Sequence, residues 1–196
     1  MLPLEGVRII AVEHYAAGPY GTLQLADLGA EVIKIENPKD PDYTRTFPPF
    51  VGEEKSSAFF AQYNRNKSAL TLDMKSERGK ALLKRLVTRA DVLVENFRPG
   101  TMDKLGLGYD DLSKENPRLI YTAISGFGRS GPNSNKPAYD NTGQATGGLW
   151  SRNGLPDQPP VRVGVRSFLP SRSATVSTQP STRWIALPAL TCTRMG

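Results

Sequence analysis

The strongest constraint on the fold is a strand–helix–strand pattern at the start of the chain. Residues 7–12 (VRIIAV) and 31–36 (EVIKIE) are short apolar runs rich in β-branched residues, which is typical of buried strands. Residues 18–30 between them have a proline in the first turn, leucines at 23, 25 and 28, and a glycine stop at 29, which favours a helix. This βαβ unit predicts parallel pairing of the two strands.

The same alternation continues along the chain. Strands are predicted at 68–74, 91–96 and 118–125, with short helical pieces around 102–105 and 109–114. The clearest helix is 76–90, which Ser76 can cap and in which Leu82, Leu83, Leu86 and Val87 form one apolar stripe. The connection 37–57 is long and rich in Pro, Asp and Thr, which indicates a functional or disordered loop. The predicted class is α/β, with a Rossmann-like, open, mostly parallel sheet and flanking helices.

Composition narrows the class of protein. The 196 residues are 38% hydrophobic and 22% charged, which fits one globular domain. No apolar run approaches the roughly 18 residues of a membrane helix, and the N-terminus has no signal-peptide pattern. Cys192 is the single cysteine, so an internal disulfide framework is excluded. We expect a cytoplasmic protein with no membrane partner.

The net charge of +6 is not evidence for nucleic-acid binding. All 19 acidic residues lie at or before position 157, where 20 basic residues nearly balance them. The excess comes from five arginines after that point, at 162, 166, 172, 183 and 194. Because no basic face is implied within the folded part, we expect no nucleic-acid partner.

Several motifs are ambiguous when read alone. Residues 126–131 (GFGRSG) match a dinucleotide fingerprint, but a loop composition follows instead of a helix, so a simple turn or a close ligand approach is favoured. His14 is the only histidine, and a structural role is favoured over catalysis because no nucleophile elbow accompanies it. No cluster has metal-ligand spacing. Residues 95–100 (ENFRPG) suit either an ordinary turn or an anion site at a strand end.

Taken together, these segments resemble family III of the CoA-transferases, which also contains acyl-CoA racemases. The resemblance covers roughly residues 4–164 and rests on six segments in the family's order: LEGVRII, AAGPYGTLQLADLGAEVIKIE, RNKSALTLDM, ADVLVENFRPGTMDKLGLGYDDL, NPRLIYTAISGFGRSGP and AYD. It implies a large Rossmann-like domain interrupted by a smaller one, in a dimer of interlocked rings. It also implies acyl-CoA and a carboxylic acid acceptor as substrates, with no covalently bound cofactor.

The resemblance further implies a set of CoA-binding positions. The segment at the end of the first strand would line the CoA cleft, and residues 72–75 would hold the adenine end through backbone groups. Residues 96–98 would continue that wall, and two lysines would lie near the phosphates. These residues are His14, Tyr15, Ala16, Leu72, Asp73, Met74, Lys75, Asn96, Phe97, Arg98, Lys104 and Lys136. Asn37 stands where many members have a phosphate-binding arginine.

The chemistry implied by the family depends on two positions. Racemases carry a histidine before the aspartate of the AYD segment, whereas this chain has Tyr139 before Asp140, which favours a transferase. Transferases use an aspartate nucleophile that forms an aspartyl-CoA thioester. The corresponding position here is Leu169, and no acidic residue follows Asp157. A reading-frame shift or an alternative 3′ end soon after Gly164 is the favoured interpretation, and a natural divergent C-terminus is the alternative.

The sequence therefore predicts an incomplete CoA-binding domain at 1–164 and an aberrant tail at 165–196. The tail has prolines at 170, 180 and 188 and ten Ser/Thr between 167 and 193, so we expect it to be mostly irregular, with at most a short element near Trp184. We expect a chain without its nucleophile that is inactive alone and forms no interlocked dimer. The alternatives are a catalytically dead CoA-binding module and an acyl-CoA racemase.

Overall fold

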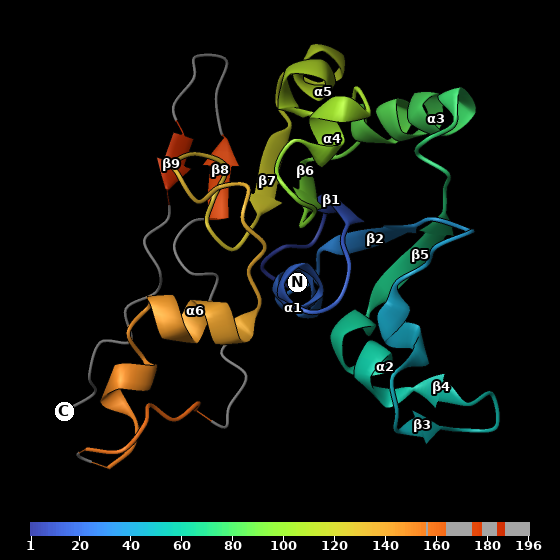
Figure 1. Cartoon of the computed structure of the whole chain (residues 1–196). Coiled ribbons are helices and arrows are strands. Elements are labelled where there is room, and N and C mark those ends of the chain that lie inside the picture. The colour runs from blue at the N-terminus through green and yellow to red at the C-terminus, as the bar shows by residue number, and fades with distance from the viewer. Residues whose placement is uncertain (156, 164–173, 178–183, 187–196) are drawn as a thin grey trace.

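The protein is built around one twisted sheet (Figure 1). The computed structural model describes residues 1–155, 157–163, 174–177 and 184–186. The strand order is β5-β2-β1-β6-β7-β8-β9. The bounds are β1 Arg8–Val12, β2 Glu31–Glu36, β5 Lys67–Thr71, β6 Val92–Glu95, β7 Ile120–Ile124, β8 Ala174–Ser177 and β9 Trp184–Ala186.

The first five of these strands are parallel and confirm the predicted sheet. Strand β1 pairs with β2 on one side and with β6 on the other, and β5 and β7 extend the sheet outward. In order along the chain these strands are numbers one to five, and their spatial order is 3-2-1-4-5, as in a Rossmann sheet. The direction of winding therefore reverses between β1 and β6, and ligands bind beyond the carboxyl ends of strands at such a switch point.

Helices cover both faces of this sheet. α1 (Ala17–Asp27) packs on one face, and α3 (Glu77–Val87), α4 (Thr101–Lys104) and α5 (Tyr109–Glu115) pack on the other. In the part of the chain that the structure describes, helices α2 (Ala58–Asn64) and α6 (Asp140–Thr146) contribute no residue to the two apolar clusters of the sheet. Alternation along β1 feeds two apolar cores, because Ile10 and Val12 join one cluster and Ile9 and Ala11 join the other. The first cluster contains Leu83 of α3, and the second contains Ala26 of α1.

Helix α3 has the N-cap and most of the apolar face that the sequence predicts. Ser76 caps it as expected, since its hydroxyl oxygen accepts a hydrogen bond from the Gly79 N–H at 3.0 Å. Leu83 and Val87 are fully buried. Leu82 was expected in the same stripe but is exposed, because it lies one position away from the face that contacts the sheet.

The predicted long loop contains structure of its own. It holds a 3-10 turn, η1 (Tyr43–Thr46), and a short hairpin of β3 (Phe50–Val51) and β4 (Ser56–Ser57), which leads into α2. The sequence analysis did not predict α2, α6 or the 3-10 turn η2 (Trp150–Arg152). The segment is ordered because Asp42 anchors it to Lys34 of β2 with a 3.0 Å ion pair.

The described part of the tail consists of two strands. β9 falls at Trp184, where a short element was expected, and β8, which was not anticipated, pairs antiparallel with β7. The remaining tail positions, Leu169 among them, lie outside the described residues. Within the described residues, no helix has the length and apolar character needed to cross a membrane.

Candidate functional site

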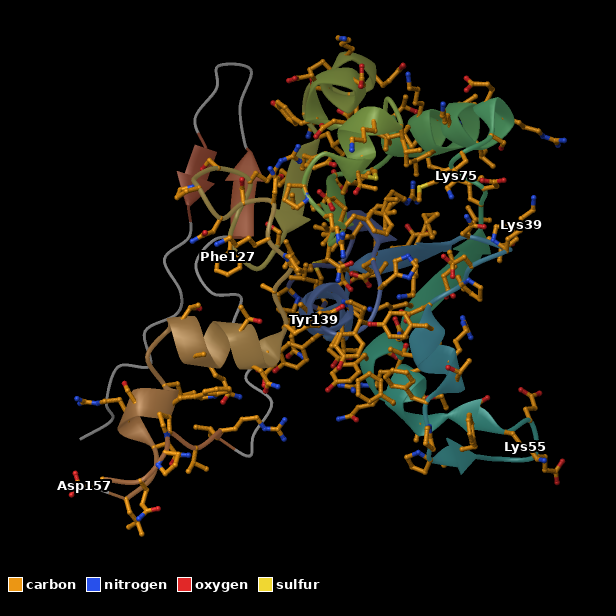
Figure 2. All side chains as sticks on the ribbon, viewed as in Figure 1. Lys39, Lys55, Lys75, Phe127, Tyr139 and Asp157 are labelled. Carbon is orange, nitrogen blue, oxygen red and sulfur yellow. The ribbon has the colours of Figure 1, made fainter. Side chains whose placement is uncertain are left out.

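A cavity of about 480 Å³ opens at the carboxyl ends of β1, β6 and β7. Two groups of residues from different parts of the chain line it. The strand-end group is His14, Tyr15, Ala16, Ala17, Tyr43, Asn96, Phe97, Arg98 and Pro99. The loop-and-α6 group is Ile124, Ser125, Gly126, Lys136, Pro137, Ala138, Tyr139, Asp140, Asn141, Gly143 and Arg162. Figure 2 shows Tyr139, the N-cap of α6, at the end of that helix that faces α1.

A reciprocal hydrogen bond joins the two strand ends at the switch point. The His14 N–H donates to Asn96 Oδ1 at 2.8 Å, and Asn96 Nδ2 donates to the His14 carbonyl oxygen at 2.7 Å. The His14 ring lies 5.2 Å from the Phe97 ring. One amide side chain thus fixes the segments that leave β1 and β6, and we call this pair the His14–Asn96 clamp.

Tyr15 follows the clamp in a strained conformation. Its φ angle is +67°, a region that non-glycine residues occupy only when their surroundings enforce it. The Asp42 carboxylate accepts from the Tyr15 N–H at 3.3 Å, and the Tyr15 ring stacks on Tyr43 at 5.6 Å and Phe59 at 5.9 Å. The strain therefore presents an aromatic ring at the cavity, as is common at functional sites.

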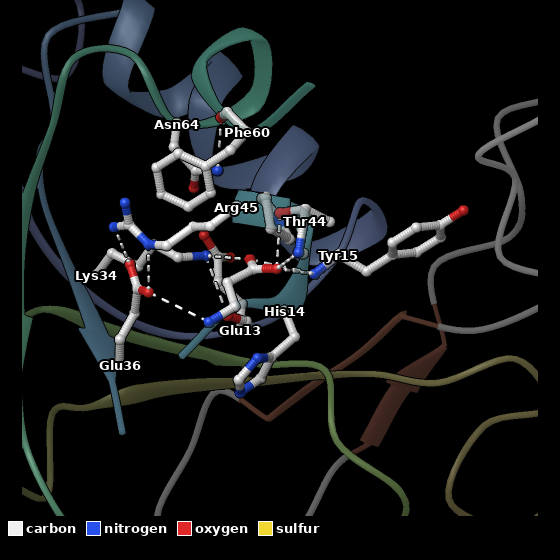
Figure 3. A network of polar contacts seen from close by, with 12 residues as sticks. Glu13, His14, Tyr15, Lys34, Glu36, Thr44, Arg45, Phe60 and Asn64 are labelled. Carbon is white, nitrogen blue, oxygen red and sulfur yellow. Dashed lines mark hydrogen bonds and ion pairs between the residues drawn. The ribbon is translucent and has the colours of Figure 1, made fainter. Parts of the chain in front are cut away.

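A buried polar network supports this turn from behind (Figure 3). Lys34 Nζ donates to Asp42 Oδ2 at 3.0 Å and to the Glu13 carbonyl oxygen at 3.1 Å. Lys67 Nζ contacts Glu13 Oε1 at 2.9 Å, and Arg45 makes a two-pronged contact with Glu36 at 2.7 and 2.9 Å. These ion pairs tie β1, β2, β5 and η1 together directly beneath the cavity.

Burial and charge shift the pKa values of this network in opposite directions. Burial alone raises the pKa of Asp42, but attraction by Lys34 and hydrogen bonds from Thr44 outweigh it, so the pKa is lowered. Burial lowers the pKa of His14, although Asp42 opposes the effect. Asp42 is therefore ionised and His14 neutral at pH 7.

Glu95, at the end of β6, is a buried carboxyl that sequence reasoning did not single out. Burial raises its pKa to about 7, although the Phe97 N–H donates to it at 2.8 Å and Arg129 lies 3.7 Å away. Arg129 also pairs with Asp103, next to α4 residue Lys104. Glu95 thus links the Gly126–Gly131 loop to the wall that carries Phe97.

The charge around the cavity favours an anionic ligand. Arg98, Lys136 and Arg162 line it, and within the described residues none of their side chains has an ion-pair or hydrogen-bond partner. Asp140 is the single carboxylate among the lining residues, and it accepts from Gln144 Nε2 at 2.8 Å. Three cations against one carboxylate leave a positive balance.

Seven of the twelve residues expected at a CoA site line this cavity. They are His14, Tyr15, Ala16, Asn96, Phe97, Arg98 and Lys136. Leu72 and Met74 belong instead to the core cluster against which Phe97 packs. Asp73 and Lys75 form the turn before α3, where Figure 2 shows Lys75 well away from Tyr139, and Lys104 is exposed on α4.

Thirteen further residues line the cavity, and three that the sequence analysis did not assign to the site are Tyr43, Asp140 and Arg162. Tyr43 lies in the segment expected to be a loop, Asp140 was noted only as part of the AYD motif, and Arg162 was counted with the tail. No local signal marks Tyr43 or Arg162, because contacts distant in sequence bring both to the cavity. Among the described residues, no group of three His, Cys, Asp or Glu could hold a metal ion.

The glycine-rich segment after β7 does not act as the start of a helix. The next helix, α6, begins only at Asp140. A side chain at Gly126 would collide with Ala138, so glycine is required where the loop folds back on itself. This agrees with the interpretation of 126–131 as a turn that lines a site rather than a dinucleotide fingerprint.

The sheet order and the cavity at the switch point define an α/β protein with a Rossmann-type sheet. The sequence matches CoA-transferase family III over residues 4–169. The chain therefore belongs to family III of the CoA-transferases.

Individual relatives agree with this assignment. The chain is 49% identical to acetyl-CoA:oxalate CoA-transferase of Acetobacter aceti, over 85% of this chain and 42% of that protein. It is 46% identical to succinyl-CoA:glutarate CoA-transferase of mouse, over 84% of this chain and 38% of that protein. A CaiB/BaiF family crystal structure from Brucella suis matches with a TM-score of 0.79 and 43% identity, over 84% of this chain and 44% of that one. The chain thus spans about 40% of the length of these curated relatives.

Proposed function

We propose that the cavity binds the CoA portion of an acyl-CoA, and that the chain is the CoA-binding part of an enzyme that moves CoA between carboxylic acids. The observation that carries this proposal is a pair of cations, Arg98 and Lys136, which line a cavity at the switch point of the sheet and have no side-chain partner among the described residues. CoA carries several phosphate charges, and arginine and lysine are the side chains that recognise phosphate. Family membership supports the same ligand.

Each part of the site has a distinct task in this proposal. The His14–Asn96 clamp holds the strand ends at a fixed separation, so the ligand meets a preformed surface. Arg98 and Lys136 supply positive charge for phosphate oxygens. The rings of Tyr15, Tyr43 and Phe97 offer apolar contact.

The chemical step in the family requires a carboxylate nucleophile. It attacks the acyl-CoA thioester carbonyl, which gives a mixed anhydride and releases the CoA thiolate. The thiolate then attacks the enzyme's carbonyl, releasing the first acid and leaving an enzyme thioester. The resemblance places the nucleophile at Leu169 of this chain, so we propose that the chain binds CoA without catalysing exchange by itself.

Racemisation is the second candidate, and one residue opposes it. The position before Asp140 is Tyr139, which lies on the cavity with 70% of its surface exposed. The histidine that racemases carry at this position supplies an imidazole base for taking a proton from an α-carbon, and tyrosine supplies no such base. Exchange of label between free acid and acyl-CoA, measured against loss of chirality at the α-carbon, separates the two reactions.

Calorimetric titration of CoA into the purified chain tests the binding proposal. We expect saturable binding at one site, and we expect Arg98→Gln to weaken it about tenfold, since a charge-assisted contact is lost. Arg118→Gln is the matched control. Arg118 precedes the amino-terminal end of β7, whereas the cavity opens at the carboxyl ends of the strands. Absence of binding, or equal losses in the two variants, would contradict the proposal.

A further inference from the structure

Arg162 lines the cavity but is not one of the residues expected to bind CoA. We propose that it is a specificity-determining residue that binds the distal carboxylate of a dicarboxylic acyl group. This inference rests on the proposed function, because it assumes that the CoA portion lies along the His14–Asn96 clamp, Arg98 and Lys136. Arg162 belongs to the loop-and-α6 group that lines the cavity together with them.

The position of Arg162 is fixed by its two neighbours. Gln144 of α6, only 2% exposed, accepts from the Val163 N–H at 3.1 Å and donates to the Val163 carbonyl oxygen at 3.5 Å. On the other side, Asn153 Nδ2 donates to the Val161 carbonyl oxygen at 3.1 Å, and the Val161 N–H donates to the Asn153 carbonyl oxygen at 3.4 Å. The backbone on both sides of Arg162 is therefore held, and its side chain lines the cavity.

The side chain of Gln144 makes hydrogen bonds to several segments on this side of the cavity. Its Oε1 also accepts from Trp150 Nε1 at 3.0 Å, and its Nε2 donates to Asp140 Oδ2 at 2.8 Å. One buried amide thus fixes the start of α6, the η2 turn and the segment that carries Arg162. Because the backbone on both sides of Arg162 is already held, only the arginine side chain itself loses freedom when it binds a ligand.

The charge on Arg162 is available to a ligand anion. Within the described part of the chain, its guanidinium has no carboxylate partner. The one carboxylate that lines the cavity, Asp140, already accepts from Gln144. With Arg98 and Lys136 assigned to the phosphates of CoA, we assign Arg162 to an anion on the acyl group.

A carboxylate is the anion that suits this position. Guanidinium presents parallel N–H donors that match the two oxygens of a carboxylate, and it keeps its charge at every pH of interest. An acyl group that ends in methyl offers no such partner. The site is therefore expected to distinguish acids that carry a second carboxylate from monocarboxylic acids of equal length.

Two four-carbon thioesters test this discrimination, because succinyl-CoA ends in a carboxylate where butyryl-CoA ends in a methyl group. Their dissociation constants and that of CoA are measured by calorimetry for the full chain, Arg162→Gln, Arg162→Lys and Arg118→Gln. We expect the unaltered chain to bind succinyl-CoA about tenfold more tightly than butyryl-CoA. Arg162→Gln should bring the ratio of the two dissociation constants to about one, and Arg162→Lys should restore part of the preference for succinyl-CoA. Arg118→Gln should behave as the unaltered chain.

The outcomes separate this inference from the proposed function. Equal binding of the two thioesters by the unaltered chain, with CoA still bound, overturns the role of Arg162 alone. The same conclusion follows if the preference survives in Arg162→Gln, or if that variant loses affinity for all three ligands while its circular dichroism is unchanged. If the unaltered chain binds none of the three ligands, the proposed function falls, and this inference falls with it.

Discussion

At the scale of single residues, the Lys34–Asp42 ion pair is the feature whose loss should cost most. Both side chains are almost completely buried, and Asp42 also holds the strained Tyr15 N–H. Asp42→Ala leaves the Lys34 charge buried without its partner, so we expect a loss of about 3–5 kcal/mol in the free energy of unfolding. Urea denaturation measures it, with Asp111→Ala, which removes a long contact on the exposed surface of α5, as the control. A loss below about 1 kcal/mol would contradict a structural role for the pair.

Glu95 should make the protein less stable as the pH rises, whereas most carboxylates in folded proteins have the opposite effect. Its pKa rises from 4.5 in the unfolded chain to about 7 in the fold because it is buried. Between these values the folded state holds a proton that the unfolded state has released, so stability falls as the pH rises. Glu95→Gln removes this titration. We therefore expect its unfolding free energy, relative to the unaltered chain, to increase by about 3 kcal/mol between pH 4.5 and pH 8.

Denaturation of the two proteins at several pH values, at constant ionic strength, measures this difference. A difference that is flat with pH would show that Glu95 keeps an ordinary pKa in the fold. The Phe97 N–H can still donate to the amide oxygen of glutamine, so the variant retains the hydrogen bond of the wall. The pH dependence is consequently attributable to charge rather than to loss of this contact.

The sequence indicated the ligand-facing residues better than the residues that support them. Asn96 and Arg98 follow a strand directly, so their place on the cavity could be predicted. Glu13 and Lys67, in contrast, are 54 positions apart and form a 2.9 Å ion pair. Each looks like an ordinary surface charge in its own segment, because burial arises only when β1 and β5 come together with α1.

At the scale of elements, the contact between α1 and the switch point depends on Gly18. A Cβ atom there would lie 2.9 Å from the Glu13 Cβ and 3.1 Å from the Asn96 Cγ. Gly18→Ala should push α1 away from the clamp, and we expect a loss of about 1–3 kcal/mol in stability together with weaker CoA binding. The matched control is Gly21→Ala in the same helix, where nothing lies within 4 Å.

Gly21→Ala should stabilise the protein by about 0.5–1 kcal/mol, because alanine loses less backbone entropy in a helix. Thermal unfolding and CoA titration of both variants make the comparison. If both substitutions shift stability in the same direction, the close approach at Gly18 is not what fixes α1. The comparison therefore separates crowding at the clamp from helix propensity.

Elements were predictable where a local pattern specified them. The parallel strands and α3 carry apolar periodicity and a capping serine, and the structure has them within a few residues of the predicted bounds. α6, with the sequence DNTGQAT, has weak intrinsic helix propensity. It forms around contacts such as that of Gln144 with the distant Val163, and a local reading of the sequence does not reveal such contacts.

At the scale of the whole molecule, the cavity should be independent of the tail beyond Val163. Among the described residues, every one that lines the cavity lies at or before Arg162, and the five parallel strands lie within the same range. The described tail contributes β8, which pairs with β7, the outermost of the five parallel strands. A chain that ends at Val163 should therefore keep its fold and its affinity for CoA within about threefold.

What should change is association between copies. Without β8, residues Ile120–Ile124 of β7 present unpaired N–H and C=O groups, which can pair with another chain. We expect the full chain to be monomeric and the shortened chain to associate as its concentration rises, measured by size-exclusion chromatography with light scattering. Adding a lysine on the exposed edge, as Thr122→Lys, should suppress that association, because a desolvated charge opposes edge pairing. A shortened chain that stays monomeric at high concentration would show that β8 is not needed to protect this edge.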